Sequence, residues 1–379
     1  MKIKYYLLSF LMLIFFSEIH SLPRFSLRGG GGDCLGCHVN PTGGNMRNKS
    51  GWGFGKNVLP MITPEDDFQM SNKIGDNIQL GLDLRGQTLL KTIPSTDGNK
   101  YKIDFQRMTG SIYTNIDLSE KINVFTRYDF IQQIWEAYGV AHILPNNSYV
   151  KGGAFQPNYG IRLDDHTAYI RGGDLDLLFS TNVKTGLLYD PRYIETGVEL
   201  GFYFSDFAFL TASVGNPRSS LLFEYDPVYT ANLKIQPEIG ENKALFFGGS
   251  IAAFRGFIPI IGRVFPEVKM YGGYVGFGIG DFTIMGEYDM ANDYLYKDSA
   301  STALMVEVAY RIIKGLEAVV RLDRFDPNSD IDKDEYTRVI IGFEIFPYSF
   351  IEIKPQYRIQ MEDPSIDNDS ALIQFHIWY

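Results

Sequence analysis

Apolar and polar residues alternate in short segments from about residue 75 to the end of the chain. Residues 78–85 read IQLGLDLR, and residues 306–308 read VEV. A period of two residues is typical of a β-strand with one apolar and one polar face. In residues 122–130 the polar positions include Arg127 and Asp129, so charge gathers on one face. The pattern predicts an all-β fold with about 14 recognisable strands, and the ambiguous residues 131–192 would supply about two to four more.

The length of this region favours a membrane barrel over a soluble β-fold. Residues 75–379 number 305, and 16 strands would leave roughly 19 residues for each strand with its connection, which suits transmembrane strands of about 10 residues. In such a barrel the apolar face contacts lipid and the polar face lines the lumen. A soluble β-sandwich or propeller is the alternative, but no blade-like repeat is visible. We therefore predict a transmembrane antiparallel β-barrel of about 16 strands.

Both ends of the chain agree with export to an outer membrane. Lys2 and Lys4 precede an apolar run of 12 residues, 5–16, which is too short to span a bilayer and is typical of a signal peptide, here residues 1–21. A short buried helix is the alternative. At the other end, Ala371, Ile373, Phe375, Ile377 and Tyr379 form one apolar face that closes on a terminal aromatic residue. This face resembles the last-strand assembly signal of outer-membrane barrels, although an ordinary strand at a chain end would show the same alternation.

Composition narrows the functional classes. The chain has 24 Tyr, 28 Phe and 38 Gly, which is too apolar and aromatic for a disordered protein. Two cysteines are too few for a disulfide-stapled scaffold. The formal net charge is -10, so nucleic acid is a poor partner, because phosphate affinity depends on Lys and Arg.

The two cysteines carry the most specific signal in the sequence. They form the motif Cys34-Leu-Gly-Cys37-His38 in a segment that we assign to residues 22–74, between the signal peptide and the barrel of residues 75–379. This is the spacing of covalent c-type haem attachment, in which two thiols add to the haem vinyl groups and the adjacent His ligates the iron. The sequence thus predicts one haem c. A thioredoxin-like redox pair, a zinc site and a strained disulfide stay open as alternatives.

The second axial ligand of such a haem is harder to assign. Met46 is the prediction, because residues 40–44 read NPTGG and are able to fold the chain back toward the iron. The alternatives are that Met46 only packs on the haem face, or that the sixth position is open or filled from the barrel. The alternative ligands are Met61, Met70, His142, His166 and His376.

The segment around the motif resembles a known family. Residues 22–28 (LPRFSLR), the CLGCH motif, Pro41 and residues 51–54 (GWGF) are similar to the haem segment of the fused outer-membrane cytochrome–porins, which include iron-oxidising cytochromes. The resemblance implies that Cys34 and Cys37 are thioether residues, that His38 is the proximal ligand, and that a porin-like barrel follows. The Gly run at 29–32 and the NPTGG turn depart from the best-known iron oxidases.

Charge placement adds three expectations. Residues 22–60 carry five basic residues and one acidic residue, which suits a haem segment inside an acidic barrel, although the segment would also fit below it. Residues 323–335 are rich in carboxylates; Asp326, Asn328 and Asp330 match the start of a calcium loop, but Ile331 replaces the required glycine, so a solvated outer loop is favoured. Residues 162–171 form a second charged cluster, either a constriction, a loop latch or simply polar lining.

Together these features predict an outer-membrane electron conduit. Extracellular Fe(II), as the resemblance implies, would donate electrons through the haem to a periplasmic c-type cytochrome. The protein is then a redox carrier, with Fe(II) oxidation as its implied activity. Two alternatives stay open: an outward conduit to an extracellular acceptor, and a diffusion porin whose haem segment is a gate or sensor.

Overall fold

The computed structural model describes residues 23–28, 34–63, 71–93, 98, 100–165, 167–173, 186–217, 227–258, 263–362, 365 and 367–379. The expected signal peptide, residues 1–21, and the Gly run at 29–32 lie outside the described residues.

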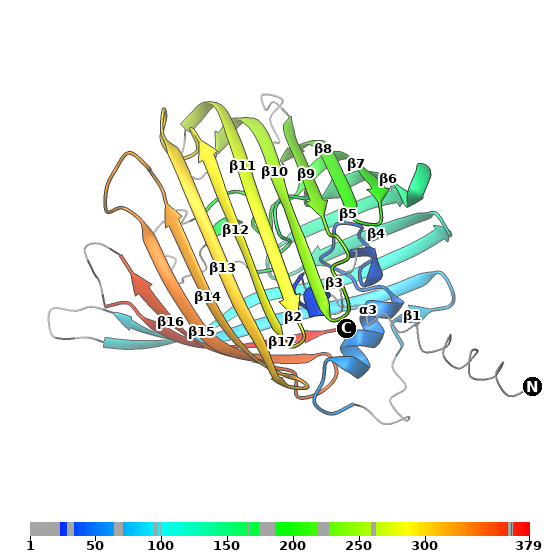
Figure 1. The fold of residues 1–379 in the computed structure, drawn as a ribbon, viewed down its shortest axis with the longest axis horizontal. Coiled ribbons are helices and arrows are strands. Elements are labelled where there is room, and N and C mark those ends of the chain that lie inside the picture. The colour runs from blue at the N-terminus through cyan, green and yellow to red at the C-terminus, as the bar shows by residue number, and fades with distance from the viewer. Residues whose placement is uncertain are drawn as a thin grey trace, which may run out of the picture.

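A closed antiparallel β-barrel accounts for most of the chain (Figure 1). Sixteen strands pair with their neighbours in chain order, and the last strand pairs with the first of them, which closes the ring. The predicted fold class is confirmed. The strands are β2 (Ile78–Ile93), β3 (Lys100–Ser119), β4 (Ile122–Asp129), β5 (Ile134–Ala141), β6 (Tyr149–Phe155), β7 (Glu195–Ser205), β8 (Ala208–Pro217), β9 (Val228–Ile235), β10 (Lys243–Ile258), β11 (Arg263–Ile279), β12 (Phe282–Asn292), β13 (Ala300–Ile313), β14 (Leu316–Asp326), β15 (Tyr336–Ile345), β16 (Ile351–Met361) and β17 (Ser370–Trp378), with the two-residue β1 (Lys73–Ile74) paired to β2.

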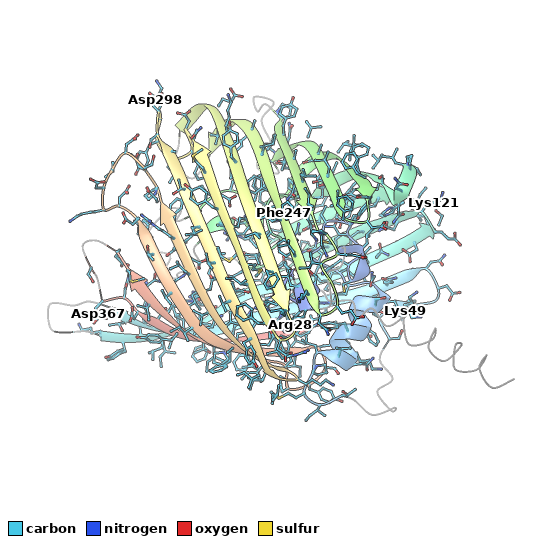
Figure 2. The ribbon with its side chains drawn as sticks, viewed as in Figure 1. Arg28, Lys49, Lys121, Phe247, Asp298 and Asp367 are labelled. Atoms are coloured by element: carbon cyan, nitrogen blue, oxygen red, sulfur yellow. The ribbon has the colours of Figure 1, made fainter. Side chains whose placement is uncertain are left out.

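The two faces of the barrel are inverted relative to a soluble protein. Phe247 of β10 points outward, as Figure 2 shows, and Phe375 of β17 is 51% exposed. Asp83 of β2 and Glu307 of β13 are buried inside the ring. This is the arrangement expected when lipid covers the apolar face and the lumen holds the polar one.

The two ends of the barrel differ. Connections at the end that holds the C-terminus are short; β3 and β4 are joined by residues 120–121, and β13 and β14 by residues 314–315. We call this the short-turn end. The opposite, long-loop end carries Asp298 and Asp367 (Figure 2) and the longest connection, residues 156–194 between β6 and β7.

The N-terminal segment lies inside the barrel at the short-turn end, and we call its described residues, 23–28 and 34–62, the plug. Phe25 and Phe54 of the plug pack against Phe346 and Trp378 of the wall. Its last residues join the β15–β16 turn, where Met61 N donates to Phe346 O at 2.8 Å. Among the described residues, no helix is both long and apolar enough to cross a membrane. Among the residues that the structure describes, the helical elements are α2 (Pro23–Arg28), η1 (Cys34–Gly36), α3 (Lys49–Gly53), η2 (Phe54–Val58), η3 (Pro145–Asn147) and η4 (Tyr169–Arg171).

The β6–β7 connection also enters the lumen, and we call its described residues, 156–165, 167–173 and 186–194, the lumen segment. Ile170 and Tyr189 are buried against inward-facing residues of β10 to β14, such as Met305. Arg171 anchors the segment to Glu287 of β12 at 2.7 Å. The ambiguous residues 131–192 therefore supply two strands, β5 and β6, and most of the lumen segment, whose described residues lie inside the ring.

Candidate cofactor site

The CxxCH motif opens a tight hairpin. Residues Cys34–Gly36 form one 3-10 turn, in which the backbone N–H groups of Cys37 and His38 both donate to Cys34 O, at 3.1 and 2.8 Å. The chain then reverses through Gly43 and Gly44, at φ angles of 79° and 73° that favour glycine. His38 pairs with Arg47 in an antiparallel bridge. We call residues 34–48 the motif hairpin.

Helix α3 locks the end of the motif hairpin. Asn48 caps it, because its side-chain oxygen accepts from Ser50 N and Gly51 N, both at 3.0 Å. The Asn48 amide also donates to Leu35 O at 2.6 Å. Residue 51 has to be glycine because the backbone of Cys37 lies so close that a Cβ at this position would be 2.1 Å from Cys37 O. The motif and the helix thus form one unit.

One side of the barrel wall holds the motif hairpin by polar contacts. Asn45 Nδ2 donates to Glu136 Oε2 of β5 at 2.7 Å, and Arg127 Nη1 of β4 donates to Asn45 Oδ1 at 3.2 Å. Lys151 Nζ of β6 lies 3.4 Å from Asn40 Oδ1. These contacts fix the hairpin's position relative to β4–β6.

Ion pairs hold the rest of the plug to the opposite side of the wall. Arg24 of α2 lies 3.1 Å from Glu307 Oε1 and 3.4 Å from Glu317 Oε2, and it also pairs with Glu344. Arg28 forms a two-pronged pair with Glu317, whose longer contact is 2.9 Å. All of these side chains are at least nine-tenths buried. Burial would lower the pKa of Arg24, but Glu307 and Glu317 raise it above its ordinary value, so its charge is firmly held.

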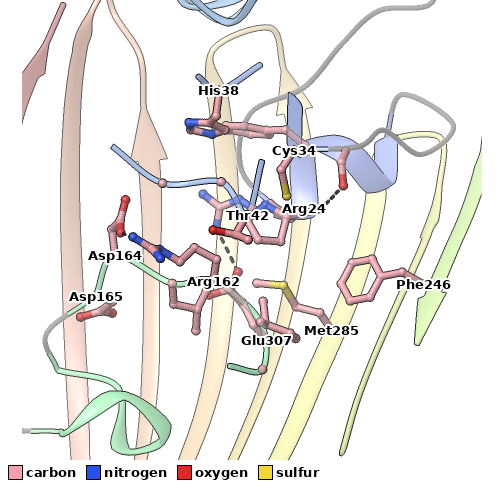
Figure 3. A pocket seen from close by; sticks show the side chains of 18 of the residues that line it. Arg24, Cys34, His38, Thr42, Arg162, Asp164, Asp165, Phe246, Met285 and Glu307 are labelled. Atoms are coloured by element: carbon pink, nitrogen blue, oxygen red, sulfur yellow. Dashed lines mark hydrogen bonds and ion pairs between the residues drawn. The ribbon is translucent and has the colours of Figure 1, made fainter. Parts of the chain in front are cut away.

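A cavity of about 880 Å³ lies between the plug, the lumen segment and the wall. Its volume falls in the range of about 300–1,000 Å³ found for cofactor and ligand sites. Cys34 and His38 line it, together with Met285 of β12 and Arg162 of the lumen segment (Figure 3). Gly43 keeps the space beside the Cys34 thiol open, because a Cβ there would lie 3.3 Å from Cys34 Sγ.

The structure brings Cys34 and His38 to the same cavity wall but buries Cys37 behind them. Cys37 is 1% exposed and does not line the cavity. Burial raises the pKa of its thiol to about 12, which is the reverse of what a reactive redox cysteine needs. The two thiols are not joined in a disulfide, and no group of three or more metal-binding side chains occurs among the described residues. The burial of Cys37 argues against a reactive redox pair, and the disulfide and zinc alternatives stay open.

Met46 and His38 lie on opposite faces of the motif hairpin. Val39 N donates to Met46 O, so Met46 shares a face with Val39, and both pack in a cluster with Phe125 of the wall. Met46 does not line the cavity. Its role as distal ligand stays a prediction that the geometry does not favour.

The alternative axial ligands predicted from the sequence lie in different parts of the structure. Met61 sits by Gly315 in the β13–β14 turn, and the His142 ring nitrogen faces Asn147 O in the β5–β6 connection. His376 lines the cavity, but its two ring nitrogens face carboxylates of Glu352 and Asp83 at 2.8 and 3.3 Å. Met70 and His166 lie outside the described residues. Met108 and Met285 also line the cavity, but the sequence interpretation did not name them. Both lie on barrel strands far from the motif, and only the position of each strand in the barrel shows that its methionine faces the cavity.

Arg47 is the basic residue that lies opposite His38 in the antiparallel bridge of the motif hairpin. Its guanidinium carbon lies 5.1 Å from the centre of the Trp378 ring. Burial lowers the pKa of Arg47 below its ordinary value, and the more distant Asp83 only partly offsets this. The charge is thus desolvated without a close counter-ion among the described residues.

The lumen segment closes the cavity toward the long-loop end with its own charges. Asp165 Oδ2 lies 2.6 Å from Arg321 Nη1, and Arg85 Nη1 donates to Asp164 O at 2.7 Å. Burial would raise the pKa of Asp165, but Arg321 and Arg358 hold it well below its usual range. The charged cluster at residues 162–171 is thus an internal latch between loop and wall.

The carboxylate-rich loop lies at the long-loop end. Asp326 Oδ1 and Asn328 Oδ1 accept backbone N–H groups from Asn328 and Asp330, at 3.0 and 3.1 Å. These oxygens cap their own turn, which agrees with a solvated outer loop.

Comparison with known proteins places the fold. No protein-family model matches the chain, and no curated protein does. Solved structures are similar in fold, including OprB of Pseudomonas putida at high pH, with a TM-score of 0.58 and 8% identity over 80% of this chain and 94% of that one. The anion-selective porin of Comamonas acidovorans (TM-score 0.56, 8% identity) and Salmonella typhi OmpF in complex with daunomycin (TM-score 0.56, 9% identity) each match over 80% of this chain and 98% of theirs. The chain therefore has a porin-like outer-membrane barrel fold.

Proposed function

We propose that this protein is an electron conduit of the outer membrane, in which one haem c is attached to Cys34 and Cys37 and ligated by His38. The observation that carries the proposal is the position of the CxxCH hairpin, inside a porin-like barrel and on the wall of a cavity of cofactor size. Short turns of such barrels face the periplasm and long loops face outward. The motif would thus stand near the periplasmic side.

The side chains around the cavity suit a haem. One thiol and one imidazole face the space directly, and Arg47 offers a cation for a propionate. Cys37, which is buried just behind, would contribute the second thioether. A bound haem c would supply a one-electron carrier whose potential depends on ligands and burial. The protein itself would position the haem, exclude water from the cavity and separate the electron path from the lipid.

The filled lumen favours a conduit over a diffusion porin. A barrel of 16 strands leaves an aqueous channel unless something occupies it. Here the plug occupies one end, and the lumen segment, latched through Arg171 and Asp165, occupies the middle. Extracellular Fe(II) is the donor we propose, because the acidic loop at residues 326–335 would attract cations to the outer end. A periplasmic c-type cytochrome would then accept the electron.

The distal iron ligand can be tested directly. Met285 lines the cavity and Met46 does not, so the geometry favours Met285 over Met46. We expect Met285→Ala to remove any sulfur-to-iron absorption band and to lower the haem potential, because a thioether stabilises reduced iron. Met46→Ala is the matched control and should leave both unchanged. The reverse result would return the ligand to Met46.

Proteoliposomes test the conduit itself. Vesicles that hold oxidised cytochrome c inside and the full-length protein in the membrane should reduce the trapped cytochrome when Fe(II) is added outside. A Cys34→Ala, Cys37→Ala barrel is the control and should not. Equal reduction by both proteins would mean that Fe(II) diffuses through the pore, and would replace the conduit by the porin alternative.

A further inference from the structure

Arg47 and His38 face the cavity together. They oppose each other in the antiparallel bridge of the motif hairpin, and opposed residues of such a pair project from the same face. Both side chains line the cavity. Any group that His38 coordinates would therefore have the Arg47 guanidinium beside it.

Most other cations of the cavity already have carboxylate partners. Arg85 lies 2.9 Å from Asp83 Oδ2, and Lys354 lies 3.0 Å from Glu344 Oε1. Among the residues that the structure describes, no carboxylate forms an ion pair with Arg47; its charge rests against the face of Trp378 instead. An arginine over an aromatic ring retains its charge but leaves its N–H groups available for an anion.

A desolvated cation without a counter-ion is unfavourable, and an anionic ligand in the cavity would offset that cost. The fork of the guanidinium matches a carboxylate, which accepts two parallel hydrogen bonds from it.

We propose that Arg47 binds a carboxylate of the cavity's ligand, and that this carboxylate is a haem propionate. The assignment rests on the proposed function. It orients the haem, because the propionate edge would point toward Trp378 and the short-turn end. A fixed cation beside the haem also favours the reduced form, which carries one positive charge less than the oxidised form.

The test compares variants of the full-length protein purified with its haem in detergent. The midpoint potential of Arg47→Gln should fall below that of the parent, and Arg47→Lys should restore most of the difference. Lys234→Gln is the matched control, since Lys234 also lines the cavity and lies 5.6 Å from an aromatic ring, that of Phe246, on a different part of the wall. Lys234→Gln should lower the potential less than Arg47→Gln does; an equal or larger fall would assign the propionate to Lys234 instead of Arg47.

Two further measurements separate the possible failures. Mass spectrometry of each variant reports whether haem is attached, so a haem-free parent would overturn the proposed function and this assignment with it. A haem-bearing Arg47→Gln with the parent's potential would overturn the Arg47 assignment alone. Added acetate or phosphate should not shift the parent's potential; a shift that disappears in Arg47→Gln would mean that Arg47 binds free anions and not the propionate.

Discussion

The mature protein, made in a host that attaches haem c, is expected to carry the mass of one haem and to lose it completely in a Cys34→Ala, Cys37→Ala variant. The two thiols are the chain's only cysteines, so no other residue can form the thioether bonds. Intact-mass spectrometry measures the addition, and the absorption spectrum of the reduced protein should lose its haem bands in parallel.

The barrel itself should survive this double substitution. Contacts that hold the plug to the wall include those of Asn40, Asn45 and the α2 arginines, and none of these contacts uses a thiol. Heat-modifiable migration in gels, the usual sign of a folded barrel, should therefore be retained. An unmodified mass for the parent chain from a competent host would contradict the haem assignment, whatever the variant does.

The second large effect is expected from Arg24→Met, which should loosen the plug at the short-turn end and raise the conductance of the barrel. Arg24 contacts Glu307, Glu317 and Glu344. Its loss leaves the buried Glu307 without the cation it pairs with, whereas Glu317 keeps Arg28 and Glu344 keeps Lys354. Removing one partner of a buried ion pair typically costs about 3–5 kcal/mol. Single-channel recordings in planar bilayers should show a clear rise in conductance relative to the parent, and thermal unfolding should shift to lower temperature.

Arg311→Met is the matched control for Arg24→Met. Arg311 also pairs with an acidic residue near the short-turn end, but the Arg311 and Asp281 side chains are 41% and 45% exposed. Exposed pairs contribute only about 0–1 kcal/mol, so conductance and stability should stay close to those of the parent. Equal conductance of Arg24→Met and the parent would show that the α2 ion pairs do not hold the plug in place.

The barrel fold could be predicted from the sequence because apolar and polar residues alternate with a period of two in each strand. Residues 78–85 and the last strand show this directly, and the apolar positions Phe375 and Ile377 do face outward. The lumen segment showed no period because it packs on several sides at once. Its partners are also remote in sequence, as Arg171 and Glu287 are 116 residues apart.

The motif hairpin shows where a sequence pattern stops being informative. The NPTGG stretch indicates a chain reversal, and Gly43 and Gly44 provide it. Which residues then share a face depends on the register after the turn. The register pairs His38 with Arg47, which sends the neighbouring Met46 to the other side. A shift of one residue would have exchanged their roles, and no local composition distinguishes the two registers.

The burial of Cys37 has a consequence for the order of biogenesis. A thiol that is 1% exposed inside a closed ring is out of reach of any attachment enzyme. The plug also forms hydrogen bonds and ion pairs with two roughly opposite groups of strands in that ring, β4–β6 and β13–β15. If the segment carries haem as we propose, its loading would precede closure of the β17–β2 seam, and the loaded segment would serve as the template around which the two groups of strands meet. On the proposed function, haem attachment and barrel assembly would then follow one fixed order.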